Sequence, residues 1–257
     1  MPQHTDRERI AAWRDALGDL PAEEILAWAA ETFPGKVALA SSLGVEDQVL
    51  MHLIAARRLP ISVFTLDTGR LFPEAYDLIA ETSSRYGVPI RVFLPEAEDV
   101  ESMIAMHGVN LFRESVAARK RCCEVRKLRP LRRALVDLRA WVCGLRREQS
   151  VTRAEVEAVE WDETNGLVKI NPLRAWTEAD VWAYVREHDV VYNPLHDRGF
   201  PSVGCAPCTR AVEPGEDVRA GRWWWESAEH RECGLHAHRG HSRPAADECY
   251  SAEGGER

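Results

Sequence analysis

Short apolar segments alternate with helical segments along most of this chain of 257 residues. Each short segment is rich in aliphatic side chains and stands next to turn residues, which is typical of buried strands. We expect strands at residues 37–40, 61–66, 90–94, 141–144 and 167–170. Because helical stretches separate most of them, the pattern predicts βαβ units. The expected fold class is therefore α/β, with an open, mostly parallel sheet and helices on both faces.

The helical pattern supports one domain and gives no sign of a second. We expect helices at 6–33 (two short ones), 46–58, 73–86, 98–107 and 122–138, and a helix capped by Thr177. From about Pro194 onward the periodicity fades and Pro, Gly, Trp and His become frequent. We expect a single domain over residues 1–240, with an α/β core at about 20–190 and an irregular segment at about 194–240. Residues 241–257 are small and polar, which predicts a disordered tail.

Charge and hydropathy exclude two broad classes. The net charge of −8 argues against a general nucleic-acid-binding protein. No apolar run approaches the roughly 20 residues that span a bilayer, and the polar N-terminus does not resemble a signal peptide. We expect a cytoplasmic protein, in which seven cysteines indicate metal binding or catalysis before disulfides.

Four of the cysteines form two pairs, Cys122-Cys123 and Cys205-Ala-Pro-Cys208. Four thiolates that meet at one point could hold an iron–sulfur cluster or a zinc ion, and the residues alone leave both open. Adjacent cysteines diverge by about 100° in a regular helix, so joint ligation predicts a distorted helix start at Cys122-Cys123.

The other three cysteines have different settings. Cys233 lies in a polar, glycine-flanked stretch beside Arg231 and His236, which would favour an accessible thiolate. Cys143 lies in an apolar strand and is expected in the core. Cys249 falls in the tail and is expected to be unpaired.

Three polar turns follow expected strands, at 41–47, 66–70 and 144–150. Ligands of open parallel sheets bind beyond the carboxyl ends of the strands, where these turns would lie together. Hydroxyls, a glycine and a helix start at 41–47 suit phosphate, and the arginines at 144–150 suit anions. Each turn alone could equally be a helix cap or a tight turn.

These turns and the cysteines together resemble the assimilatory adenylyl-sulfate (APS) reductases, the iron–sulfur branch of the APS/PAPS reductase family. The resemblance runs from about Val37 to His236. Its segments are Ser-Ser-Leu-Gly-Val-Glu-Asp (41–47), Leu-Asp-Thr-Gly-Arg (66–70), Lys-Arg-Cys-Cys-Glu-Val-Arg-Lys (120–127), Gly-Leu-Arg-Arg-Glu-Gln-Ser (144–150), Gly-Cys-Ala-Pro-Cys-Thr (204–209) and Glu-Cys-Gly-Leu-His (232–236).

The resemblance implies an adenine nucleotide α-hydrolase-like fold and a set of site residues. One [4Fe-4S] cluster per chain would be bound by Cys122, Cys123, Cys205 and Cys208, and Cys233 would be the catalytic nucleophile. Lys127, Arg219 and Arg222 would lie near the phosphosulfate. The remaining substrate-binding candidates are Ser41, Ser42, Gly44, Asp67, Gly69, Arg146 and Arg147.

The implied reaction is the thioredoxin-dependent reduction of APS to sulfite and AMP. Cys233 would attack the sulfur, expel AMP and become S-sulfocysteine, from which reduced thioredoxin would release sulfite. We expect the cluster to pass no electron to the substrate and to act electrostatically through Lys127.

Three alternatives remain open at this stage: a PAPS or dual-specificity reductase, a nucleotide-activating ligase or pyrophosphatase of the same fold, and a non-enzymatic iron–sulfur sensor. The oligomeric state is open as well, a homo-oligomer included.

Overall fold

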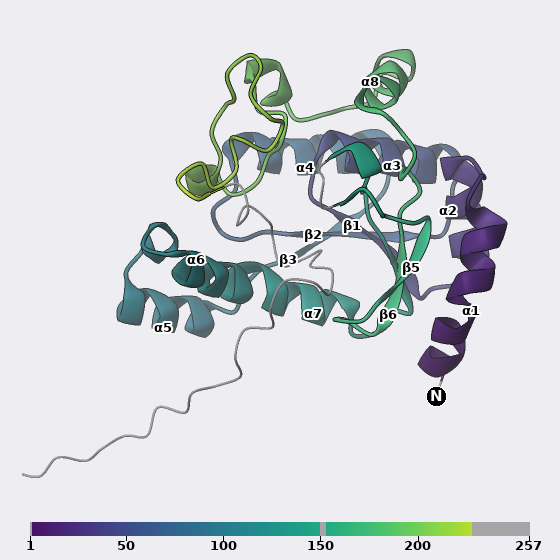
Figure 1. The fold of residues 1–257 in the computed structure, drawn as a ribbon, viewed down its shortest axis with the longest axis horizontal. Helices are drawn as coiled ribbons and strands as arrows, with labels where there is room; N and C mark the ends of the chain where they lie inside the picture. The colour runs from purple at the N-terminus through teal and green to yellow at the C-terminus, as the bar shows by residue number, and fades with distance from the viewer. Residues whose placement is uncertain (1, 150–152, 228–257) are drawn as a thin grey trace, which may run out of the picture.

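The computed structural model describes residues 2–149 and 153–227, whose strands form a six-stranded sheet (Figure 1). The strand order is β3-β2-β1-β4-β6-β5, and only the β5–β6 pair is antiparallel. The strands are β1 (Val37–Ser41), β2 (Ser62–Leu66), β3 (Ile90–Phe93), β4 (Ala140–Val142), β5 (Val159–Asp162) and β6 (Leu167–Ile170). The prediction of an open, mostly parallel α/β sheet is confirmed.

Helices cover both faces of this sheet, as Figure 1 shows. α3, α4 and α8 lie on one side, whereas α5, α6 and α7 lie on the other. The helices are α1 (Pro2–Leu17), α2 (Ala22–Thr32), α3 (Val45–Ala56), α4 (Pro73–Tyr86), α5 (Ala97–His107), α6 (Val116–Cys123), α7 (Arg129–Leu135) and α8 (Glu178–Glu187). No helix among the described residues is long and apolar enough to cross a bilayer.

The sheet and helices enclose an apolar core. Leu39 on β1, Val49 on α3 and Val168 on β6 are among the fully buried side chains of its largest cluster. Burial of each such side chain stabilises the fold by about 1.5–3 kcal/mol. The core therefore holds β1 and α3 firmly, and the turn between them emerges at a rigid edge.

Local sequence signals explain where several helices begin and end. Thr177 and Asp180 form a capping box at the start of α8, which confirms the predicted cap. Pro73 occupies the first turn of α4, and Gly87 ends that helix with a φ of 63°.

The region around the adjacent cysteines differs from the expectation. The helix expected at 122–138 is three consecutive pieces: the end of α6, a π-helical turn at Glu124–Leu128, and α7. Cys122-Cys123 therefore end a helix and do not begin one, and the distortion follows them. Pro130 has no N–H to donate back along the helix, which accounts for a wide turn just before it.

One strand and part of one helix escaped the sequence analysis. β5 carries Glu160 and Asp162, so its alternation is short and half polar. The first residues of α6 follow Ser115, whose side chain accepts a hydrogen bond from the backbone N–H of Ala118 as a helix cap. As expected, residues 194–227 are irregular apart from short 3-10 turns at His196–Arg198 and Ala206–Cys208.

Candidate active site

A cavity of about 590 Å³ lies beyond the carboxyl ends of β1, β2 and β4. Ser41 lines it from the end of β1 and Ser42 from the turn that follows, Thr68 from the turn after β2, and Gly144 from the turn after β4. The three turns singled out from the sequence therefore meet at one cavity. Its volume falls in the range of small-molecule sites.

The turn between β1 and α3 is held in an unusual conformation. Leu43 has a φ of 65°, which is strained for a residue with a side chain. The Leu43 N–H donates to Ser41 Oγ at 3.1 Å, and both the N–H and the hydroxyl of Ser42 donate to Asp47. No side chain caps α3 at Gly44. Backbone N–H groups at this helix start can therefore bind an anion in the cavity.

The two arginines after β4 point in different directions. Arg146 lines the cavity, but it is nearly buried and its guanidinium is 2.9 Å from a carboxylate oxygen of Glu46. Arg147 is not among the cavity-lining residues. It donates to the carbonyl of Val156 at 2.8 Å and pairs with Glu157 at 3.1 Å. Of the two expected ligands, only Arg146 faces the cavity.

The turn after β2 contributes a different residue from those expected. Asp67 accepts hydrogen bonds from the Gly69 N–H at 2.7 Å and the Tyr76 hydroxyl at 3.1 Å. Neither Asp67 nor Gly69 lines the cavity, whereas Thr68 between them does. The expected roles of Asp67 and Gly69 in substrate binding remain predictions without a contact to support them.

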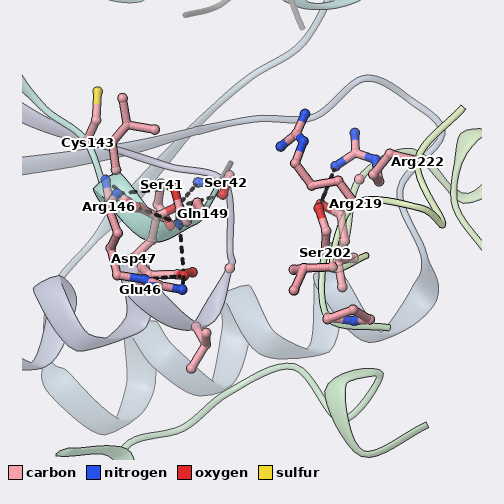
Figure 2. Close-up of a pocket in the computed structure, with 18 of the residues that line it drawn as sticks. Ser41, Ser42, Glu46, Asp47, Cys143, Arg146, Gln149, Ser202, Arg219 and Arg222 are labelled. Carbon is pink, nitrogen blue, oxygen red and sulfur yellow. Dashed lines mark hydrogen bonds and ion pairs between the residues drawn. The ribbon is translucent and has the colours of Figure 1, made fainter. Parts of the chain in front are cut away.

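One side of the cavity is basic. Lys127, Arg219 and Arg222 line it, and Figure 2 shows Arg219 and Arg222 across the opening from Ser41, Ser42 and Asp47. Arg222 lies over the ring of Trp223, 4.8 Å from its centroid. Gly204 packs directly against the Arg222 guanidinium, since a Cβ at this position would come within 2.3 Å of it and displace it. The arginine is thus held in place from two sides.

A second, smaller cavity of about 20 Å³ is lined by all four paired cysteines, Cys122, Cys123, Cys205 and Cys208. Lys127 and Arg222 line both cavities and so lie between them. In the described ranges, no three His, Cys, Asp or Glu side chains are grouped as ligands of a single metal ion. Four thiols around one hollow are the donor set of an iron–sulfur cluster and of a four-thiolate zinc site alike.

Two of these thiols, those of Cys122 and Cys208, have raised pKa values. Burial raises the pKa of Cys122, and burial followed by the charge of Cys205 raises the pKa of Cys208 to about 12. The positive charge of Lys127 lowers the pKa of Cys208 in turn. Such thiols stay protonated without metal, whereas coordination removes the proton. Cys122 and Cys208 are therefore poor free nucleophiles, and both suit a role as metal ligands.

Several cavity residues were not predicted as ligands. Glu46, Asp47, Gln149, Arg153 and His196 all line the cavity. Burial, opposed by hydrogen bonds from Ser42, raises the pKa of Asp47 to about 6. Glu46 and Asp47 both stand in the turn at 41–47, but carboxylates are poor phosphate ligands, so neither was expected to bind the substrate. Nothing in the sequence distinguished His196.

The proposed nucleophile Cys233, with its neighbours His230, Arg231 and His236, lies outside the described residues. The same holds for Cys249 and for Ser150 at the end of the arginine loop.

Comparisons with known proteins agree with the fold. The family of the phosphoadenosine phosphosulfate reductase domain matches residues 36–211. An adenosine 5′-phosphosulfate reductase of Burkholderia cepacia is 57% identical over 201 residues, which is 78% of this chain and 80% of that protein.

Two solved structures extend the comparison. The crystal structure of a phosphoadenylyl-sulfate (PAPS) reductase from Candida auris, in a phosphate complex, is 29% identical with a TM-score of 0.69. It covers 80% of this chain and 97% of that one. The FMN adenylyltransferase of Candida glabrata, at 17% identity and a TM-score of 0.52, covers 82% of this chain and 72% of that one and shares the fold alone. The chain belongs to the adenosine 5′-phosphosulfate reductases, within the phosphoadenosine phosphosulfate reductase domain family.

Proposed function

We propose that this protein reduces adenosine 5′-phosphosulfate to sulfite and AMP, with reduced thioredoxin as the electron donor. The observation that carries the proposal is the position of Lys127 and Arg222, which line both the large cavity and the cysteine cavity. An anionic nucleotide whose phosphosulfate reaches this boundary meets positive charge there. We further propose that residues 1–240 act as one reductase domain.

The first chemical step is a transfer of the sulfo group. The sulfur of APS is electrophilic but surrounded by negative oxygens, so an attacking thiolate needs cations nearby. Lys127, Arg219 and Arg222 are the cavity residues suited to this, and they would also stabilise the charge on the departing phosphate. The Cys233 thiolate forms an S–S bond to the sulfo group as the bridging S–O bond breaks. AMP leaves with the electron pair of that bond.

The second step returns the enzyme to its starting state. A thiolate of reduced thioredoxin attacks the sulfur of Cys233, and sulfite leaves with the electrons of the S–S bond. The second thioredoxin thiol then displaces Cys233, so thioredoxin ends as a disulfide. The two thiols of the partner supply both electrons.

The four thiols around the cysteine cavity are a donor set that suits a [4Fe-4S] cluster, which Cys122, Cys123, Cys205 and Cys208 would hold. When bound, it supplies fixed negative charge beside the basic end of the large cavity. Lys127 lines both cavities, so its ammonium can balance that charge and still face the substrate. The residues that move electrons and protons in the proposed reaction are Cys233 and the thiols of the partner.

PAPS is the alternative substrate, since the family model bears its name and a PAPS reductase shares the fold. The test is a competition between APS and PAPS with reduced thioredoxin, read as sulfite released per nucleotide consumed. APS reductase activity requires that APS be reduced with a higher kcat/KM than PAPS. Equal or higher kcat/KM with PAPS would make the protein a dual-specificity or PAPS reductase.

A further inference from the structure

Asp47 joins two loops at the wall of the large cavity. Its carboxylate accepts hydrogen bonds from the Ser42 N–H at 2.6 Å, the Ser42 hydroxyl at 2.7 Å and the Gly144 N–H at 3.2 Å. Ser42 follows β1 and Gly144 follows β4, and these two strands are paired neighbours in the sheet. The buried Asp47 side chain therefore connects the turn at 41–47, the phosphate turn, to the loop at 144–150, the arginine loop.

Both loops are built around this carboxylate. A Cβ on Gly144 would lie 2.4 Å from Asp47 Oδ1 and 3.0 Å from the Cβ of Glu46, so the loop approaches as closely as glycine allows. Leu43, next to Ser42, has a strained φ of 65° that surrounding contacts must maintain. The two bonds from Ser42 to Asp47 provide part of that restraint.

No ion pair joins Asp47 to a cation in the part of the chain that the structure describes. Glu46 on the same helix is acidic, Arg146 across the loop pairs with Glu46, and the buried thiol of Cys143 directly follows β4. Burial first, and Glu46 to a smaller extent, raise the pKa of Asp47, whereas the donors of Ser42 and Gly144 lower it. A buried carboxylate without a cation is costly in free energy. Such a group at a cavity wall is typical of a functional position.

We propose that Asp47 is a positioning residue for the nucleotide, and that its carboxylate holds the phosphate turn so that the uncapped start of α3 faces the ligand's anionic oxygens. The inference rests on the function proposed above. It also changes the expected role of Ser42. Because its N–H and hydroxyl both donate to Asp47, Ser42 shapes the turn and does not supply those donors to the ligand.

Protonation would break this arrangement. A neutral carboxyl accepts hydrogen bonds from the Ser42 and Gly144 N–H groups more weakly than a carboxylate does, and its own O–H occupies one of the accepting positions. Nucleotide affinity should therefore decline as pH falls through about 6, where Asp47 takes up its proton. The phosphosulfate of APS is a strong acid at both groups and stays fully charged across this range.

The experiment measures APS binding without turnover, in a Cys233→Ser background, by calorimetry from pH 5 to pH 8. The parent should bind APS about tenfold more weakly at pH 5 than at pH 7, as expected for one proton with a pKa near 6. Adding Asp47→Asn should weaken binding at pH 7 and reduce the change with pH to less than twofold. Asp6→Asn is the matched control, because Asp6 is a buried carboxylate paired with Arg139 outside the cavity.

Ser42→Ala provides a second test that does not depend on the folding of the Asp47 variant. It removes the hydroxyl bond that lowers the pKa of Asp47, so the midpoint of the pH profile should move upward. An unchanged midpoint in Ser42→Ala, or an Asp47→Asn protein that keeps the parent's affinity and pH profile, would overturn the inference and leave the proposed function intact. If the parent fails to bind APS at any pH, the proposed function itself is wrong.

Discussion

The hydroxyl of Thr68 lies 3.2 Å from Sγ of Cys205. Thr68 also lines the large cavity, so this contact joins the substrate side of the turn after β2 to the cysteine cavity. The adjoining backbone strengthens the link, because the Ala206 N–H donates to the carbonyl of Arg70 at 2.8 Å. The turn at 66–70, which the sequence predicts as part of the substrate site, therefore also supports the loop that carries Cys205.

Removal of the Thr68 hydroxyl should weaken retention of the cluster. Thr68→Val keeps the shape of the side chain but cannot donate to Cys205, and a hydrogen bond to a charged sulfur is worth about 1.5–3 kcal/mol. We expect the brown absorbance to bleach several-fold faster in the presence of an iron chelator. Thr164→Val is the control, since Thr164 lies in the exposed turn between β5 and β6. Equal bleaching rates in the two variants would contradict the role given to Thr68.

Lys127 should affect catalysis and not cluster content. Lys127→Met removes the charge shared by the two cavities, and we expect kcat/KM for APS to fall about 10- to 100-fold, the range of one charge-assisted contact. Iron content and absorbance should match the parent. Lys120→Met is the control, because Lys120 is exposed on α6 and lines neither cavity. Full activity of Lys127→Met with an intact cluster would rule out electrostatic coupling through this residue.

A buried ion pair anchors the segment that leads toward Cys233. Arg119 on α6 donates to Glu226 through two nitrogens at 3.0 and 2.8 Å, and their side chains are only 1% and 4% exposed. Glu226→Gln leaves the buried guanidinium without its carboxylate, which typically costs about 3–5 kcal/mol.

Urea unfolding can test this anchor. The control is Glu24→Gln, which breaks the exposed pair with Arg57 and should cost less than about 1 kcal/mol. Similar losses in the two variants would mean that the buried pair contributes no more to stability than a surface one.

The raised pKa of Asp47 should also make the free energy of unfolding depend on pH. Its pKa is about 6 in the folded protein against an ordinary value of 3.8, so the folded state holds the proton more tightly. The stability that this proton contributes is complete below pH 4 and is lost as pH rises through about 6. The difference corresponds to about 3 kcal/mol.

Asp47→Asn should therefore gain stability relative to the parent between pH 4 and pH 7, as measured by urea unfolding at each pH. A constant difference across this range would show that Asp47 has an ordinary pKa.

The alternation of apolar and helical segments was enough to predict the parallel sheet and the meeting of three turns at one edge. It could not predict β5, because the pairing of Val159–Asp162 with β6 supplies the stability that its short, acidic pattern lacks. The expectation that both adjacent cysteines are ligands placed the helix distortion at Cys122-Cys123, whereas the π-turn follows them, just before Pro130.

The sequence alone could not predict the directions in which the side chains of the site point. Arg146 and Arg147 are neighbouring residues of the same type, yet Arg146 pairs with Glu46 and Arg147 pairs with Glu157, so their side chains point in different directions. Ser42 has the hydroxyl and N–H donors of a phosphate ligand, yet in the structure both donate to Asp47. Pairing partners distant in the chain decide both cases, so the composition of a turn cannot reveal them.

The central claim is that four cysteines hold a cluster and a fifth carries the sulfo group. The most direct measurement compares Cys233→Ser with Cys249→Ser, following sulfite release from APS with reduced thioredoxin. We predict that both variants keep the parent's iron content and brown absorbance, that Cys249→Ser turns over normally, and that Cys233→Ser releases no sulfite. Sulfite release by Cys233→Ser at the parent's rate would contradict the account.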